Sequence, residues 1–222
     1  LVVFGIAIIP GFMNAFLVTS LLLDRRPQIR TRADGLPGVS ILVAAYNEAA
    51  SIASTIDSIE RQDYPGPLQV IVIDDGSTDG TGAVLAGIRQ PWLEVIALPR
   101  NGGKAAALNQ GLQQVRFGLT VTLDGDSYLY RHALRHLIGR YLSDPPDTRA
   151  VAGAVLIRNS RKNLVTAAQE WDYFHGIAAV KRMQSMYHGT LVAQGAFSLY
   201  TREALEQVGG WPECVGEDIV GS

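Results

Sequence analysis

Short apolar runs alternate with amphipathic stretches along most of the chain. Apolar runs rich in β-branched residues predict strands at 39–45, 68–73, 94–98, 119–123 and 150–157. Amphipathic stretches predict helices at 48–62, 81–88, 104–115, 132–142 and 164–186, and a last apolar run covers 193–200. Strands that alternate with helices indicate an α/β domain in which helices flank a mostly parallel sheet.

The first segment has a different pattern. Residues 1–23 contain no charged side chain, and the run is about as long as the ~20 residues that cross a bilayer. We expect a transmembrane helix here, with a kink near Pro10; the alternative is a helix buried in a protein core. Four arginines follow within residues 24–38, a stretch whose charge, Pro and Gly content predicts a juxtamembrane linker. By the positive-inside tendency, these arginines place the following domain, 39–222, in the cytoplasm.

Composition narrows the class of protein. The 222 residues are 47% hydrophobic, which suits one globular domain with a large core and an apolar appendage. Nineteen Lys and Arg residues against 21 Asp and Glu residues leave no basic excess, so we expect no nucleic-acid partner. The single cysteine, Cys214, excludes an internal disulfide and a multi-cysteine zinc site, and it favours a reducing compartment.

Acidic and polar residues come directly after three of the predicted strands. Parallel sheets bind ligands at the carboxyl ends of their strands, so these residues are the candidates for chemistry. The three segments are Tyr46-Asn47-Glu48, Asp74-Asp75-Gly76-Ser77 and Asp124-Gly125-Asp126.

Asp124 and Asp126 are separated by one glycine at a predicted strand end. Two carboxylates so placed can share a hard divalent cation, magnesium or manganese, that also binds phosphate oxygens. Such a cation stabilises the charge that grows on a diphosphate leaving group. The alternative is a turn in which each Asp accepts hydrogen bonds from nearby amides.

Two further segments have both a structural and a ligand-binding interpretation. Asp74 and Asp75 either form a turn before the next helix or present one carboxylate to a ribose or a base edge. The segment Asn101–Lys104 precedes a predicted helix, where backbone amides and a lysine can approach a phosphate. It lacks the pattern of a Walker A loop.

Candidates nearer the carboxyl end are weaker. Asp218 follows Glu217, and one carboxylate of such a pair can serve as a general base, although the residues by themselves favour a solvated acidic turn. His132 and His136 have the i,i+4 spacing of metal ligands, but the sequence shows no acidic partner near them. Trp171 is suited either to stacking on a sugar ring or to core packing.

Taken together, six short motifs resemble, in order and spacing, those of the family 2 glycosyltransferases. They are Ala45-Tyr46-Asn47-Glu48, Asp74 to Asp79, Asn101 to Asn109, Asp124-Gly125-Asp126, Gln194 to Phe197 and Gly216-Glu217-Asp218. The sequence is similar to the bacterial poly-N-acetylglucosamine synthases of this family, which are related to chitin-oligosaccharide, hyaluronan and cellulose synthases. The similarity covers essentially the whole chain after the linker.

The resemblance implies a GT-A fold and an inverting transfer from a UDP-sugar, with N-acetylglucosamine as the sugar and a glycan as the acceptor. It implies that Asp124 lies near the donor sugar, that Asp126 ligates a magnesium or manganese ion, and that Asp218 takes the proton from the acceptor hydroxyl. The residues that it assigns to the uridine are Ala44, Tyr46, Glu48 and Asp75, with Lys104 beside them.

By the same resemblance we expect a bacterial inner-membrane enzyme that contacts the lipid bilayer and a small membrane partner subunit. The Gln-x-x-Arg-Trp motif and the distal transmembrane helices of the family do not occur in these 222 residues, so we expect a domain truncated at its carboxyl end. Two alternatives remain at this stage. One is a non-processive transferase that acts on a lipid or an oligosaccharide, and the other is a membrane protein that binds nucleotide-sugars without catalysis.

Overall fold

The computed structural model describes residues 8–23, 35–154 and 196–212. The chain divides into two compact units, Leu1–Pro27 with Ala154–Leu191 and Gln28–Gly153 with Val192–Ser222. In the first unit the described residues form helix α1, Ile9–Leu23, which has 15 residues. Across the three described ranges, no helix combines the length and the apolar character needed to cross a membrane. The transmembrane segment expected at 1–23 therefore stays a prediction.

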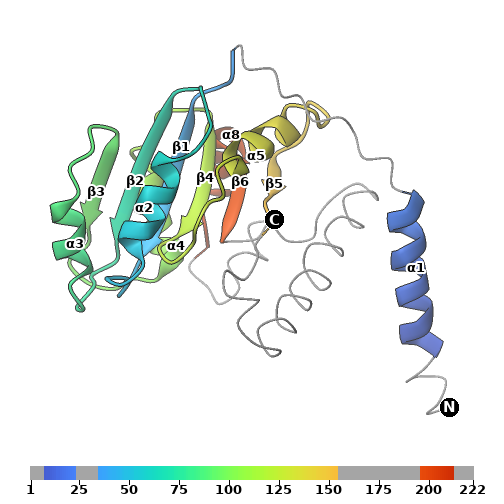
Figure 1. Ribbon diagram of the computed structural model, residues 1–222, viewed down its shortest axis with the longest axis horizontal. Helices are drawn as coiled ribbons and strands as arrows, with labels where there is room; N and C mark the ends of the chain where they lie inside the picture. The colour runs from blue at the N-terminus through green and yellow to red at the C-terminus, as the bar shows by residue number, and fades with distance from the viewer. Residues whose placement is uncertain (1–7, 24–34, 155–195, 213–222) are drawn as a thin grey trace. The chain divides into compact units, whose positions relative to one another are not determined.

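The second unit is built on a six-stranded sheet (Figure 1). Its spatial order is β3-β2-β1-β4-β6-β5. The strands are β1 (Val39–Ala45), β2 (Leu68–Asp74), β3 (Leu93–Ala97), β4 (Leu119–Asp124), β5 (Ala150–Ala152) and β6 (Phe197–Thr201). Strands β1 to β4 pair in parallel, whereas β6 is antiparallel to both β4 and β5. The sheet is thus mixed, with a parallel part that the alternating pattern predicted.

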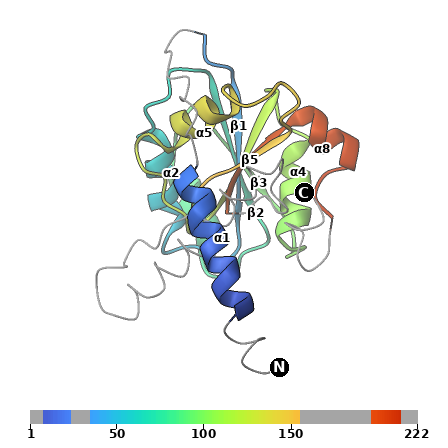
Figure 2. The same ribbon diagram turned by 90° about the vertical axis from the view of Figure 1, so that its right-hand side faces the viewer.

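Helices cover both faces of this sheet. Figure 2 shows α2 and α5 on one side of the strands and α4 and α8 on the other. The helices of the second unit are α2 (Ile52–Glu60), α3 (Thr81–Gly87), α4 (Lys104–Leu112), α5 (Ala133–Tyr141) and α8 (Arg202–Val208). Because both faces are covered, six of the seven β1 residues are buried, which explains the continuous apolar run in the sequence.

Most of the predicted elements are confirmed, with shifts at their ends. The strand predicted at 39–45 has the observed bounds of β1. Strands β2 and β4 each end one residue later than predicted, and β3 begins and ends one residue earlier than predicted. Helix α2 begins four residues later than predicted because residues 48–51 form a loop that is bound to the next loop of the chain. The helical stretch predicted at 164–186 lies outside the described residues.

Helix α8 has no counterpart among the predicted elements, although the sequence contains its end signals. The hydroxyl of Thr201 accepts a hydrogen bond from the amide of Ala204 at 3.2 Å, which caps the first turn. Gly209 ends the helix with φ of 78°, a conformation that glycine adopts readily. A seven-residue helix is too short to show a clear apolar period, and this explains why the pattern alone missed it.

Helix α4 lies very close to the sheet at Gly111. A Cβ atom at this position would lie 2.7 Å from Cδ1 of Ile73 and 3.0 Å from Cδ2 of Leu42, and both of these side chains are fully buried. Glycine therefore allows the helix and the central strands to approach.

We expect the substitution Gly111→Ala to destabilise the domain. Overpacking a core costs about 1–3 kcal/mol, whereas alanine gains up to about 1 kcal/mol over glycine inside a helix. Gly87→Ala in α3 is the matched control because no atom lies within 4 Å of its Cβ position. Urea unfolding should show a lower free energy of unfolding for the first variant only, and equal stability of the two variants would contradict the packing argument.

Candidate active site

The candidate site lies where β1 ends between its two parallel neighbours. Ala45 is opposite Asp74 of β2, and Ala44 is opposite Asp124 of β4. The chain stays close to β1 after both neighbours end, because the amides of Asp75 and Gly125 donate to the carbonyls of Ala45 and Ala44, each at 2.9 Å. The predicted acidic segments therefore meet at one edge of the sheet.

The turn after β4 depends on a glycine. A Cβ atom at Gly125 would lie 3.0 Å from the Cβ of Ala45 and 3.1 Å from the carbonyl oxygen of Ala44. The carbonyl of Gly125 also accepts a hydrogen bond from the buried hydroxyl of Thr55 at 2.8 Å. These contacts fix the backbone between Asp124 and Asp126.

Asp75 is a buried carboxylate that binds the start of α4. Its side chain is only 3% exposed, and its two oxygens accept hydrogen bonds from the amides of Gly102 at 2.9 Å and Gly103 at 2.8 Å. Hydrogen bonds to an ionised carboxylate are stronger than those between neutral groups. The amides that the sequence offered to a phosphate are thus occupied by a side chain, so that interpretation of Asn101–Lys104 was wrong for these two amides.

Asp74 has the structural role that its turn-forming composition indicated. One of its carboxylate oxygens accepts a hydrogen bond from the amide of Ser77 at 3.0 Å, within its own loop. The adjacent carboxylates of Asp74 and Asp75 therefore have different structural roles. Asp74 closes the loop after β2, whereas Asp75 joins that loop to the segment before α4.

Lys104, the first residue of α4, forms an ion pair with Asp124. The distance between Nζ and Oδ1 is 2.6 Å, and the two side chains are 27% and 32% exposed. Asp124 thus already has a cationic partner in the protein. This contact brings two predicted donor-binding residues together across the sheet edge.

Asp126 is exposed, and no side-chain partner for it occurs among the residues that the structure describes. Carboxylate oxygens are the ligands that magnesium and manganese prefer, so the pair Asp124 and Asp126 fits a hard divalent cation chemically. Within the described ranges, no group of three His, Cys, Asp or Glu side chains is placed to hold a metal ion. A cation here would need further oxygen ligands besides these two carboxylates.

The loop after β1 is joined to the loop after β2 by a row of hydrogen bonds. Three successive amides of the first loop donate to side chains of the second: Asn47 to Ser77 Oγ at 2.9 Å, Glu48 to Thr81 Oγ1 at 2.8 Å and Ala49 to Asp79 Oδ2 at 3.0 Å. This arrangement holds the backbone that carries Tyr46, whose side chain is 45% exposed.

Asn47 completes the connection between the two loops. Its side-chain oxygen accepts from the amide of Thr78 at 2.8 Å, and its φ of 57° is in the left-handed region that asparagine tolerates better than most residues. The carboxylate of the neighbouring Glu48 accepts a hydrogen bond from the hydroxyl of Ser51. From the sequence, Asn47 was a candidate only as part of the polar segment after the first strand, and Thr81 was not a candidate. Asn, Ser and Thr after strand ends commonly form such side-chain bonds.

Seven of the eight predicted site residues lie at this sheet edge. They are Ala44, Tyr46, Glu48, Asp75, Lys104, Asp124 and Asp126. The eighth, Asp218, lies outside the described residues, as does Trp171.

The histidine pair differs from its prediction. His132 Nδ1 lies 3.2 Å from a carboxylate oxygen of Asp63, so an acidic partner exists that the sequence did not reveal. Arg135 contacts the same oxygen at 3.1 Å. A carboxylate already neutralised by a guanidinium is a poor ligand for a metal ion, and the group is better described as a surface ion-pair cluster.

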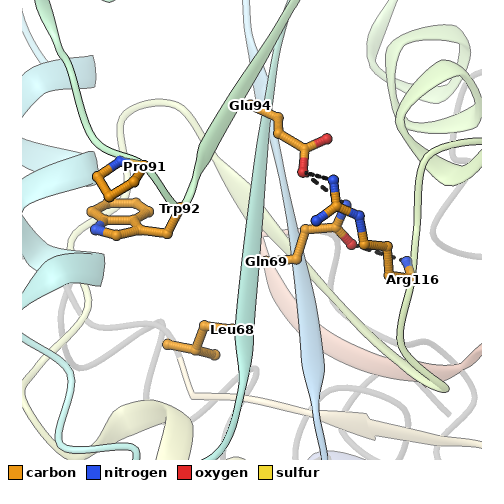
Figure 3. A pocket seen from close by; sticks show the side chains of 6 residues that line it. All are labelled: Leu68, Gln69, Pro91, Trp92, Glu94 and Arg116. Carbon is orange, nitrogen blue, oxygen red and sulfur yellow. Dashed lines mark hydrogen bonds and ion pairs between the residues drawn. The ribbon is translucent and has the colours of Figure 1, made fainter.

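A groove of about 310 Å³ lies at the opposite end of the strands (Figure 3). It is lined by Leu68, Gln69, Pro91, Trp92, Glu94 and Arg116. Arg116 forms an ion pair with Glu94 at 2.6 Å, and Gln69 accepts a hydrogen bond from the Arg116 amide. These contacts connect the beginnings of β2, β3 and β4, which are remote from the acidic edge.

The mixed α/β sheet, with acidic loops after its parallel strands, has the GT-A fold that comparison with known proteins also shows. The profile of the family described as "Glycosyl transferase family 2" matches residues 40–209. The chain belongs to this family.

Curated relatives of the chain include bacterial synthases. It is 29% identical over 213 residues to a poly-beta-1,6-N-acetyl-D-glucosamine synthase of Staphylococcus epidermidis, covering 95% of this chain and 51% of the relative. It is 31% identical over 199 residues to the synthase of the same name from Staphylococcus aureus, covering 89% and 47% of the two chains. The chain therefore spans about half the length of these relatives.

Solved structures with the same fold include a mannosyltransferase and the protein TarS. A mannosyltransferase from Pyrobaculum calidifontis, in complex with GDP-Man and Mn²⁺, has a TM-score of 0.72 and 26% identity and covers 94% of this chain and 57% of its own. S. aureus TarS in complex with UDP has a TM-score of 0.55 and 23% identity and covers 83% and 53%, a likeness in fold alone.

The loop connection predicts a pH dependence. Hydrogen bonds from the Thr81 hydroxyl and then from the Ala49 amide lower the pKa of Asp79 below its ordinary value of 3.8. A carboxylate with a lowered pKa stabilises the folded state above the unfolded pKa, and this contribution is lost as the pH falls through the folded pKa. Asp79→Asn should therefore be less stable than the unsubstituted chain at neutral pH, and the difference should shrink below about pH 4.

Urea unfolding at neutral pH and near pH 3 measures this difference. Asp147→Asn is the matched control because Asp147 is an exposed carboxylate in a turn remote from these loops, and it should show no such dependence. A stability difference for Asp79→Asn that stayed constant with pH would show that the ionised carboxylate is not what holds the loops.

Proposed function

We propose that this chain transfers a sugar from a UDP-linked donor, with N-acetylglucosamine as the sugar, to a growing polysaccharide. The two Staphylococcus relatives carry the name of such a synthase and match nearly the whole of this chain. The observation that carries the proposal is the sheet edge itself. It places the buried Asp75, the Lys104–Asp124 ion pair and the exposed Asp126 after three adjacent parallel strands.

The donor nucleoside would bind to the loops after β1 and β2. Ala44 lies at the end of β1, Tyr46 and Glu48 follow β1, and Asp75 follows β2. The hydrogen bonds between these loops hold them in place before the donor arrives, which reduces the entropy that binding costs. Each oxygen of the Asp75 carboxylate keeps a further lone pair beyond its bond to a glycine amide, so Asp75 can still accept a hydrogen bond from a uracil N–H.

A divalent cation, magnesium or manganese, would be held by Asp126, with Asp124 beside the donor sugar. When bound, the cation would neutralise charge on the diphosphate. The mannosyltransferase of similar fold contains Mn²⁺ with its nucleotide-sugar, which supports a metal-dependent donor site in this family. Beside these two carboxylates, oxygens of the diphosphate would serve as further ligands of the cation.

The chemical step assigned to this chain is a single displacement. The acceptor hydroxyl would give its proton to the carboxylate of Asp218 while its oxygen forms a bond to the anomeric carbon. The bond from that carbon to the diphosphate oxygen breaks, UDP leaves with the electron pair, and the anomeric configuration inverts. This role of Asp218 rests on the family motif Gly216-Glu217-Asp218.

We also propose that the catalytic domain lies on the cytoplasmic side of a bacterial inner membrane. The apolar residues 1–23 and the arginines that follow support an anchor with this orientation. A nascent glycan at the bilayer, and a small membrane partner subunit, would fit the synthases that the chain resembles. The length of the product separates this proposal from single addition of a sugar to a lipid or an oligosaccharide.

We expect UDP binding that depends on manganese and is lost on substitution of Asp126. Calorimetric titration of UDP into the chain should give a measurable affinity with Mn²⁺, and Asp126→Ala should weaken it at least about tenfold, since a charged hydrogen-bonding or metal contact contributes more than about 1.4 kcal/mol. Asp147→Ala removes an exposed carboxylate in a turn away from the site and is the matched control.

GDP in the same titration tests the base. Weaker binding of GDP than of UDP supports a uridine site, whereas preference for GDP would assign the donor class of the Pyrobaculum neighbour instead. Tight UDP binding that is independent of both Mn²⁺ and Asp126 would contradict the proposed metal site.

A further inference from the structure

The Lys104–Asp124 ion pair places the lysine ammonium group beside the proposed binding position of the divalent cation. Nζ of Lys104 lies 2.6 Å from Oδ1 of Asp124, and Asp126 follows two residues later. The lysine charge therefore neutralises Asp124, one of the two carboxylates of the turn from Asp124 to Asp126. Asp126 has no such partner among the described side chains.

The backbone on both sides of this ion pair is fixed. The segment before Lys104 is held by the bonds from Gly102 and Gly103 to Asp75, and the turn after Asp124 is held by the contact between Gly125 and Ala44. The lysine side chain, in contrast, is a flexible four-carbon chain and is 27% exposed. The pair can open by rotation of one side chain, without movement of the loops.

An ion pair with this degree of exposure is weak enough to exchange partners. Pairs of exposed charges stabilise proteins by up to about 1 kcal/mol because water screens them. A diphosphate carries more negative charge than one carboxylate and competes effectively for an ammonium group. A static role in folding is the alternative, and it predicts only a loss of stability when the pair is removed.

We propose that Lys104 is a built-in counter-ion that occupies Asp124 until a donor diphosphate draws it away, so that a divalent cation binds well only together with the donor. This inference rests on the proposed donor site. While Lys104 contacts Asp124, its charge repels a cation and reduces the negative charge at Asp124 and Asp126. Once the diphosphate takes over the ammonium group, the lysine charge no longer repels a cation from Asp124 and Asp126. Metal and donor thereby favour each other's binding, and such coupling is reciprocal.

The test is the affinity for Mn²⁺ without nucleotide, measured from the electron paramagnetic resonance signal of free Mn²⁺. Lys104→Met removes the charge and keeps a long side chain. It should bind Mn²⁺ about fivefold more tightly than the unsubstituted chain in the absence of nucleotide, which is the scale of a partly exposed ion pair. Addition of UDP should then raise the Mn²⁺ affinity of Lys104→Met by a smaller factor than in the unsubstituted chain.

Two controls separate this role from folding. Lys104→Arg keeps the charge and should keep weak Mn²⁺ binding in the absence of nucleotide. Arg116→Met breaks an ion pair of the same length, 2.6 Å to Glu94, at the other end of the strands (Figure 3) and should leave Mn²⁺ affinity unchanged. Circular dichroism on the same samples shows that each variant is folded.

The outcomes also distinguish this inference from the proposed function. If the unsubstituted chain shows Mn²⁺-dependent UDP binding but Lys104→Met has unchanged or weaker nucleotide-free Mn²⁺ affinity, the counter-ion role is wrong and the donor site stands. If the unsubstituted chain binds neither UDP nor Mn²⁺, the donor site itself is wrong and the counter-ion role falls with it. The donor site and the counter-ion role are both supported if the unsubstituted chain shows Mn²⁺-dependent UDP binding and Lys104→Met binds Mn²⁺ more tightly without nucleotide.

Discussion

The parallel pairing of β1 with β2 on one side and β4 on the other is the constraint on which the site depends. Parallel neighbours require crossover connections, here through helices, and these bring every strand back in the same direction. All three strands therefore end at one edge of the sheet. Because β1 is buried along nearly its whole length, the acidic side chains of this edge come at the ends of its neighbouring strands or directly after them. The strand order and direction thus determine where the acidic residues lie, and the side-chain contacts determine only how they are arranged there.

The three carboxylates at this edge have different surroundings. Asp75 is buried and satisfied by two glycine amides, Asp124 is paired with Lys104, and Asp126 is exposed to solvent. Buried charge requires such partners, whereas exposed charge does not. Asp75 is thus held in one position, whereas Asp126 is accessible from solvent. This suits a site in which Asp75 helps to recognise the donor and Asp126 can bind a metal ion that enters with it.

The central strands of the fold could be predicted from the sequence because strands that are buried on both faces are nearly continuous apolar runs, as β1 and β2 are. Strand β1 was predicted with its observed bounds for this reason. The start of α2 was predicted too early, since residues 48–51 look helical by composition but bind the loop after β2. Helix α8 was missed because its seven residues are few for a periodic signal.

The site was predictable in position but not in its internal contacts. Acidic residues after strand ends predicted the edge, and the described residues among them lie there. The bonds from Gly102 and Gly103 to Asp75, and the contact of Asp63 with His132, join residues that are 27, 28 and 69 positions apart. Such contacts depend on how the loops approach in three dimensions, for which a single sequence has no local signal.

The most direct test of the donor site is a crystal structure of the chain with UDP and Mn²⁺, with anomalous diffraction recorded at the manganese edge. Our account predicts an anomalous peak in contact with the Asp126 carboxylate and the diphosphate, with the uracil ring beside Asp75 and Tyr46. A manganese peak or a uracil ring located elsewhere, for example in the groove near Trp92, would contradict the assignment of the carboxyl edge as the donor site.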